Sequence, residues 1–458
     1  PRPPPVPVEL PVYRIGIHEF ATSSLRHGAG GAYRPDFVRH RSPAGGFKNL
    51  ERNKSAAQRQ LNAIRDPVAR LPLEISSEIF LGCLTSQREP RAHVAPLLFL
   101  NICNAWTDIA ISTPAMWDTI ELYFRGADCL RSWLSRAGKR MLTIALYRGL
   151  DHGVAEVLSQ HASQLKHLIL REEVDDELRS LVASVESFPQ LDTLIIGSLP
   201  DGYDDYARFS VSLVLKVLRL VPNLVEFTLE GVERLCVADS PEDNLILSQL
   251  TSLKFSRLHD AEAILLHLTT PALETLVLPY GSSANTTFSL FFRRSSPPLE
   301  KLVLVDEQDG DFDLREILMQ VLPSVTHLEL SPYGRSSAVN LFSSLENLPS
   351  DCLQNLRTLI IKIRGSLTLE PSRYHAVLRF LSPRRTTIAH FGLFHYAYKA
   401  PPVVDKDSRE GYRRLVDNGM HVWMGTNEHN YLAGWLQQPD GMAFVCLGYP
   451  KLIFLLDQ

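Results

Sequence analysis

The chain has 458 residues, of which 45% are hydrophobic and 21% are charged, the composition of a globular protein with several domains or one long array. Its formal net charge of −4 gives no reason to expect binding to nucleic acid or to a membrane surface. No apolar run is long enough for a transmembrane helix, and no apolar segment of a secretion signal follows Pro1. Because the six cysteines are also scattered, we expect reduced thiols and a cytoplasmic or nuclear protein.

Residues 1–55 are rich in Pro, Gly, Arg and Ser, and residues 1–60 hold ten Lys or Arg against four Asp or Glu. A segment with so few apolar side chains cannot bury enough surface to offset its chain entropy. We therefore predict a disordered, solvated arm.

Residues 56–116 are predicted to form a helical module. After a polar helix that ends before Pro67, three short helices are expected between Leu71 and Trp117. The first opens with Leu71-Pro72 and carries Ile75 and Ile79 one turn apart. The second is the apolar segment 94–100, and the third covers about 103–111. Helices this short cannot bury a core alone, so the module needs a neighbour.

The module carries Leu-Pro-x-Glu-Ile-x-x-x-Ile-Phe, then Cys-x-x-Trp, then Ser-Thr-Pro-x-x-Trp, in that order. This series resembles the F-box-like modules of large fungal protein families, over about residues 57–117. The resemblance implies docking on the Skp-type adaptor of a cullin–RING ubiquitin ligase. The adaptor-binding residues would be Leu71, Pro72, Ile75, Ile79 and Leu84. The alternative is that these side chains pack on the following domain and the module is a plain helical cap.

From residue 117 to 398 the sequence repeats the pattern apolar-x-x-apolar-x-apolar, with successive clear copies starting 23 to 33 residues apart. The clear copies start at Leu165, Leu191, Leu224, Leu250, Leu273, Leu299, Val325 and Leu356, and weaker copies start at Trp117, Met141 and Ile388.

This period and pattern are typical of leucine-rich repeats, in which each copy is a short strand followed by a helix. A prolyl residue stands two positions before the strand in five copies, where it ends the preceding helix. The ninth position of the pattern, often Asn in regular repeats, is never Asn here. We predict an α/β fold: a short three-helix F-box-like module followed by one irregular, curved leucine-rich-repeat solenoid with a parallel sheet.

Residues 399–458 are predicted to cap the last repeat, because a solenoid must cover its terminal apolar face. A helix is expected to end at Gly419, and closing strands are expected at 421–425 and 444–447.

Motifs for chemistry are missing from the sequence. It contains no phosphate-binding loop, no nucleophile elbow and no zinc-binding His or Cys pattern. We therefore expect no enzyme activity, no cofactor and no small-molecule substrate, although an enzyme with an unrecognised site is one alternative.

The function predicted from these features is that of a substrate-receptor subunit of a Skp–cullin–F-box type ubiquitin ligase, whose repeat array binds an unidentified target protein. The alternative is a repeat scaffold without a ligase role. Target contacts are expected on the concave strand face, at Lys166, His167, Asp192, Thr193, Glu274, Thr275, Thr326 and His327.

Overall fold

The structure is a computed structural model, and the chain divides into two units, Pro1–Ala57 and Gln58–Gln458. It describes residues 50, 53–54, 56–58, 60–61, 66–84, 91, 93–123, 126–147, 150–171, 175–197, 207–236, 244–258, 261–279, 284–306, 314–320, 323–349, 351–364, 370–395, 404–426, 430 and 432. Residues 1–49 of the predicted disordered arm and the predicted strand 444–447 lie outside these residues. The described residues from 50 to 61 are helical.

Between residues 66 and 116, the described part of the module forms the α-helices α2 (Leu73–Gly82) and α3 (Asn104–Ile111), with 3-10 turns at Val68–Arg70, Phe99–Asn101 and Pro114–Met116. The α-helix predicted over 94–100 is wrong. This segment forms a series of tight turns, in which Phe99 N–H donates to the Pro96 carbonyl at 3.1 Å. Pro96 has no N–H and favours such short-range bonding over a regular helix.

The core of the module is aromatic. Phe80 of α2 stacks on Phe99 with ring centroids 4.4 Å apart, and it also packs against Trp106 at 4.7 Å. Trp117 follows the module, is fully buried and donates from Nε1 to the Ala110 carbonyl at 2.8 Å. The edge of Trp117 also meets Trp133, with centroids 4.9 Å apart. The last residue of the Ser-Thr-Pro-x-x-Trp motif therefore packs into the first repeat.

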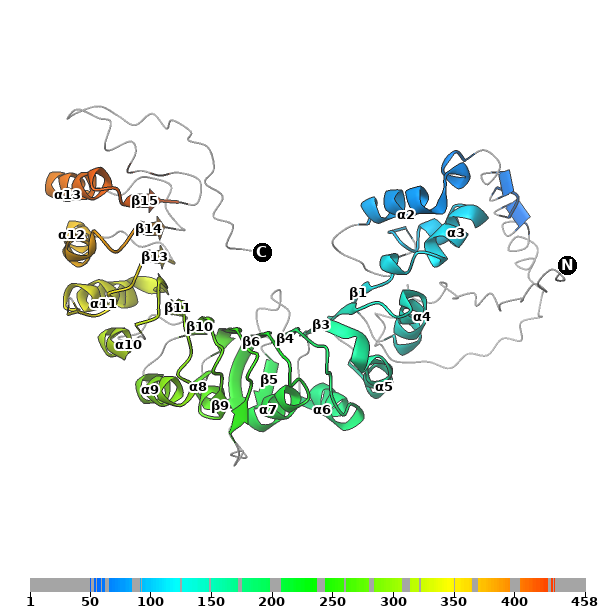
Figure 1. Cartoon of the computed structure of the whole chain (residues 1–458), viewed down its shortest axis with the longest axis horizontal. Helices are drawn as coiled ribbons and strands as arrows, with labels where there is room; N and C mark the ends of the chain where they lie inside the picture. The colour runs from blue at the N-terminus through cyan, green and yellow to red at the C-terminus, as the bar shows by residue number, and fades with distance from the viewer. Residues whose placement is uncertain are drawn as a thin grey trace, which may run out of the picture. The chain divides into compact units, whose positions relative to one another are not determined.

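The remaining described chain is a repeat solenoid built on a thirteen-stranded sheet (Figure 1). Its strands are β1 (Thr119–Leu122), β2 (Leu142–Leu146), β3 (Leu165–Arg171), β4 (Thr193–Gly197), β5 (Ala207–Ser210), β6 (Glu226–Cys236), β8 (Ser252–Leu258), β10 (Thr275–Pro279), β11 (Lys301–Val305), β12 (His327–Ser331), β13 (Thr358–Ile363), β14 (His390–His395) and β15 (His421–Gly425). They follow one another in chain order, except that β5 pairs only with β6 and that β7 (Leu245–Ile246) and β9 (Leu268–Thr269) form a separate two-stranded sheet.

Helices cover one side of this sheet (Figure 1). They are α4 (Ala127–Ala137), α5 (His152–Gln160), α6 (Asp175–Ser184), α7 (Val211–Arg219), α8 (Ala261–Leu265), α9 (Ala284–Ser295), α10 (Leu314–Gln320), α11 (Gly334–Glu346), α12 (Pro371–Leu381) and α13 (Lys406–Asp417). All strand pairs in the sheet are parallel, as expected when crossover connections, most of them with a helix, join successive strands.

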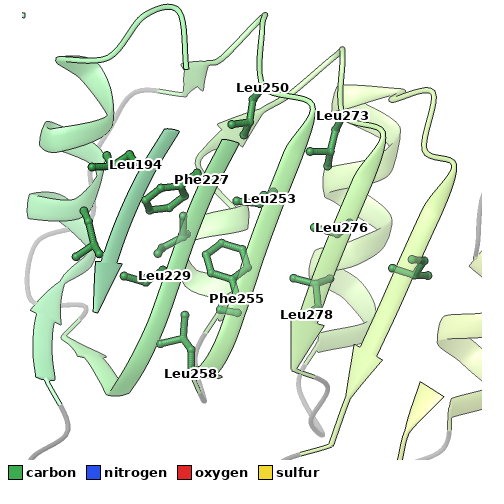
Figure 2. Close-up of a cluster of buried hydrophobic side chains, with 14 of the residues drawn as sticks. Leu194, Phe227, Leu229, Leu250, Leu253, Phe255, Leu258, Leu273, Leu276 and Leu278 are labelled. Atoms are coloured by element: carbon green, nitrogen blue, oxygen red, sulfur yellow. The ribbon is translucent and has the colours of Figure 1, made fainter. Parts of the chain in front are cut away.

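The periodic apolar residues lie in register across the strands and face the helices. Leu276 of β10, for example, is the register partner of Leu253 on β8 and of Leu302 on β11, and all three are buried (Figure 2). The weaker copies also form strands, β1, β2 and β14. The prediction was wrong for one residue of these copies, Met141, which is 43% exposed. Leu142 occupies the buried position instead, where the register of β2 shifts.

Asparagine side chains link successive units at the turns before the strands. Asn223 Nδ2 donates to the Pro189 carbonyl at 2.9 Å, and Asn355 Nδ2 donates to the Pro323 carbonyl at 2.8 Å. Each asparagine thus bonds to the carbonyl of a proline in the preceding unit, and this proline is one of the five that stand two positions before a repeat copy. In these two units a bond between units comes from an asparagine directly before the first apolar residue of the repeat pattern, Leu224 or Leu356.

Two arginines also bridge units. Arg384 is buried after α12 and donates from Nη2 to the Pro349 carbonyl of the preceding unit at 2.7 Å. Arg294, at the end of α9, donates from Nε to the Leu268 carbonyl at 3.0 Å. In the sequence both belong to Arg-Arg pairs that look like surface charges. In each pair one arginine bonds to carbonyls of the preceding unit, and the other is exposed.

Replacing Arg384 by leucine should lower the free energy of unfolding by about 2 kcal/mol or more, because carbonyls of two units lose a charged donor. The same change at the exposed neighbour Arg385 should alter stability by less than about 0.5 kcal/mol. Urea denaturation of both variants measures the difference. Equal stabilities would mean that the Arg384 contacts contribute nothing.

The C-terminal part of the described chain ends the solenoid. Helix α13 stops at Asp417, and Gly419 follows with a φ of 91°, a conformation that favours glycine. Strand β15 then pairs with β14, so the predicted helix end and the predicted strand at 421–425 are confirmed.

Candidate functional site

Two surfaces of the second unit correspond to the predicted sites. The first is the outer side of helix α2 in the module, and the second is the face of the large sheet that the helices do not cover, called here the open strand face.

Six large hydrophobic side chains of the module remain between 37% and 50% exposed: Leu71, Leu73, Ile75, Ile79, Leu98 and Ile111. Helix α2 turns Ser76 and Phe80 inward, so Ile75 and Ile79 are left on its outer side. The Ser76 hydroxyl donates to the Val68 carbonyl at 3.1 Å, which fixes the rotation of the helix. Ile75 and Ile79 lie one turn apart, so on this side of α2 two exposed aliphatic side chains are neighbours.

The predicted adaptor-binding residues differ in exposure. Leu71, Pro72, Ile75 and Ile79 are exposed, whereas Leu84 is half-buried and packs against the core. Sequence reasoning missed Leu73, Leu98 and Ile111 as exposed residues. Periodicity alone could not find them, because it shows which residues are apolar and not which of them the aromatic cluster leaves uncovered.

The eight predicted target-binding residues all lie at exposed or half-buried positions of the open strand face, but they form two groups. Lys166, His167, Asp192 and Thr193 belong to β3, β4 and the residues before them, whereas Glu274, Thr275, Thr326 and His327 belong to β10, β12 and the residues before them. Strands β6 and β8 lie between the groups. One compact ligand therefore does not reach all eight.

Within the first group Lys166 and Asp192 form an ion pair, with Nζ and Oδ2 3.6 Å apart and both side chains more than 40% exposed. Such a pair adds little stability and leaves both groups available to a partner. In the second group burial lowers the pKa of His327 to about 4, with Lys301 and Lys362 adding to the effect. The imidazole is therefore neutral near neutral pH.

The open strand face also holds an ion pair that the sequence did not reveal. Arg171 of β3 pairs with Glu230 of β6, although β4 runs between these strands. The residue of β4 in register with both is Gly197, and a Cβ there would lie 2.2 Å from the Glu230 carbonyl oxygen. Glycine at this position therefore permits the close approach.

A second ion pair on this face joins Lys362 and Glu329, with Nζ and Oε1 2.6 Å apart. Near the module, the rings of Tyr123 and Tyr147 stack with centroids 4.5 Å apart. Burial is the main cause that raises the pKa of Tyr147, and Glu121 adds to it. The face therefore combines rigid aromatic rings with fixed charges, which suits recognition of a protein surface.

Within the described ranges, no group of three or more His, Cys, Asp or Glu side chains is placed to hold a metal ion. No helix in that part of the chain has the length and apolar character needed to cross a membrane.

The fold and these surfaces define a repeat solenoid of strand–helix units preceded by a short helical module. No family model matches the chain, and no curated protein matches it. The crystal structure of a Bacteroides fragilis protein is similar, with a TM-score of 0.34 and 16% sequence identity. The match covers 57% of this chain and 66% of that chain, just under two thirds of the length of that protein. At this TM-score the likeness carries no argument.

Proposed function

We propose that this chain is a substrate-receptor subunit of a Skp–cullin–F-box type ubiquitin ligase, with an F-box-like module and a leucine-rich-repeat-like array. The observation that supports this proposal is that α2 has one buried side and one exposed apolar side. Phe80 holds the helix to the module, while Ile75 and Ile79 stay exposed on its outer side. A helix that presents aliphatic side chains one turn apart is a common way to dock on an apolar groove.

In this proposal the open strand face binds the target protein. This face carries half-buried rings, ion pairs and threonines. The side chains that it offers to a target differ from one strand to the next. The Lys166–Asp192 group and the Thr275–His327 group lie far enough apart along the sheet to contact different parts of one extended target.

Replacing Ile75 and Ile79 together by alanine should weaken binding to a Skp-type adaptor at least about tenfold, because buried apolar anchors commonly contribute about 2 kcal/mol each. Alanine favours helix, so α2 should remain folded. Binding is measured by titration of purified chain with a purified adaptor, and circular dichroism checks the fold.

Leu290→Ala is the matched control, because Leu290 on α9 is similarly exposed and lies outside the module. It should bind the adaptor like the wild type. Failure of the wild type to bind any Skp-type adaptor would exclude the ligase role. Equal binding by wild type and double variant would place the contact elsewhere on the module.

A scaffold with a helical cap is the second candidate function, and the packing of Trp117 on Trp133 favours it. The Arg136 guanidinium also lies over the Trp117 ring, 4.5 Å from its centroid. These contacts are those of a cap that covers the first repeat. The adaptor titration distinguishes the two candidates, since a cap alone requires no adaptor.

A further inference from the structure

The outer edge of β15 is the end of the large sheet in the described part of the chain. His421 N–H donates to the Ala389 carbonyl beside β14 at 2.8 Å. Because backbone groups of alternate residues point to opposite sides of a strand, those of Val422 and Met424 point away from β14. Such an outward row of donors and acceptors is a template on which another strand can add.

The Asn430 side chain binds to this row. Its Nδ2 donates to the Val422 carbonyl at 3.3 Å, and its Oδ1 accepts from Met424 N–H at 3.2 Å. A residue of a neighbouring parallel strand would bond to these same two groups through its own N–H and C=O. The primary amide of asparagine carries one donor and one acceptor in a similar arrangement, so it replaces that residue.

The position of Asn430 is itself fixed by the backbone. Asn430 forms an antiparallel bridge with Gly425, and its Oδ1 also accepts from Leu432 N–H at 3.1 Å. Leu432 is only 2% exposed and belongs to the hydrophobic core, so it anchors the chain just beyond the asparagine. The amide is therefore held against the edge and does not need to be ordered by a partner.

The strand itself lacks the usual protection of a sheet edge. Natural edge strands are blunted by lysine or other charges, by proline or by bulges. The sequence of β15, His-Val-Trp-Met-Gly, contains no Lys, Arg, Asp, Glu or Pro. Its β-branched and aromatic residues favour strand pairing. A second copy of the same strand, related by a twofold axis, would pair with it in antiparallel fashion through these same outward groups.

We propose that Asn430 closes the outer edge of β15, which ends the sheet within the described residues, and thereby prevents two copies of this chain from joining through β15. The assignment is independent of the ligase role, because it concerns the opposite end of the solenoid from the module.

The test replaces Asn430 by leucine, which keeps the size of the side chain and removes both hydrogen bonds. Light scattering after size exclusion, over a wide range of protein concentration, should show the apparent mass of Asn430→Leu double relative to the wild type. Adding Val422→Pro to this variant should restore the wild-type mass, because proline removes an outward N–H and leaves the bonds to β14 intact.

Asn223→Leu is the matched control. It also removes an asparagine that bonds to a backbone carbonyl, but at a turn between units far along the sheet. It should keep the wild-type mass. If Asn430→Leu keeps the wild-type mass, or if Asn223→Leu associates equally, the proposal is overturned.

Hydrogen exchange of the wild-type chain gives a second measurement that needs no variant. The Met424 amide should be protected, although it points away from β14, because Asn430 accepts its hydrogen bond. Exchange of this amide at the rate of a free peptide would overturn the assignment even if Asn430→Leu failed to fold.

Discussion

Leu276→Asp should lower the free energy of unfolding by at least about 4 kcal/mol, the largest stability effect expected here. Leu276 has no exposed surface, and its register partners Leu253 and Leu302 are also buried leucines. A carboxylate there would have no partner and would disrupt the contact between three successive units. Because each unit is stabilised only by its neighbours, the loss should spread along the array.

The control for this variant is Thr275→Asp, one residue earlier. Thr275 is half-buried on the open strand face, beside Lys301 in the register of β11. The same carboxylate there should change stability by less than about 0.5 kcal/mol. Thermal and urea unfolding of both variants measure the difference. Wild-type stability for Leu276→Asp would mean that the register of the solenoid is wrong.

The second large effect concerns pH. Burial lowers the pKa of His395, at the end of β14, to about 4, whereas an unfolded histidine titrates near about 6.5. Between these values the folded chain binds fewer protons than the unfolded chain, so stability falls as the pH falls through this window. The loss linked to His395 should reach about 2 kcal/mol between about pH 7 and about pH 5.

His395→Phe should remove this part of the pH dependence, because the ring remains and the titrating group is lost. Phe394→Leu, which alters packing at the adjacent buried position without removing a titratable group, should keep it. His327, whose pKa is also lowered to about 4, should contribute in the same direction and leave a residual slope. Urea denaturation across this pH range tests the expectation, and an unchanged slope in His395→Phe would contradict it.

The repeat architecture could be predicted because each unit carries its own signal. A strand such as Leu165–Arg171 shows alternating apolar residues, and the following helix shows its own stripe, within a few tens of residues. The prolines before the strands mark where each helix ends. Stacking of units then follows from the apolar faces alone, so even the weak copies at β1, β2 and β14 were placed in the sheet.

The polar contacts between units could not be predicted in the same way. Arg384 and Arg385 are adjacent and chemically identical, yet one is buried against carbonyls of the preceding unit and the other faces solvent. The Pro349 and Cys352 carbonyls that accept from Arg384 lie more than thirty residues away, and no short pattern specifies which of the two side chains turns inward. The same reason applies to Gly197, because the backbone that approaches it closely is that of Glu230 on the neighbouring strand β6.

The sequence by itself determined the period, the class of each unit and the apolar side of the strands in the clear copies, because these depend on interactions within one unit or between adjacent units. Only the tertiary structure decided which apolar side chains of the module remain exposed, which charged residues pair across the open strand face and how β15 ends the sheet. These depend on the positions of segments distant in the chain, such as Phe99 against Phe80. Burial is a property of the packed assembly, and a residue's own neighbours in sequence do not fix it.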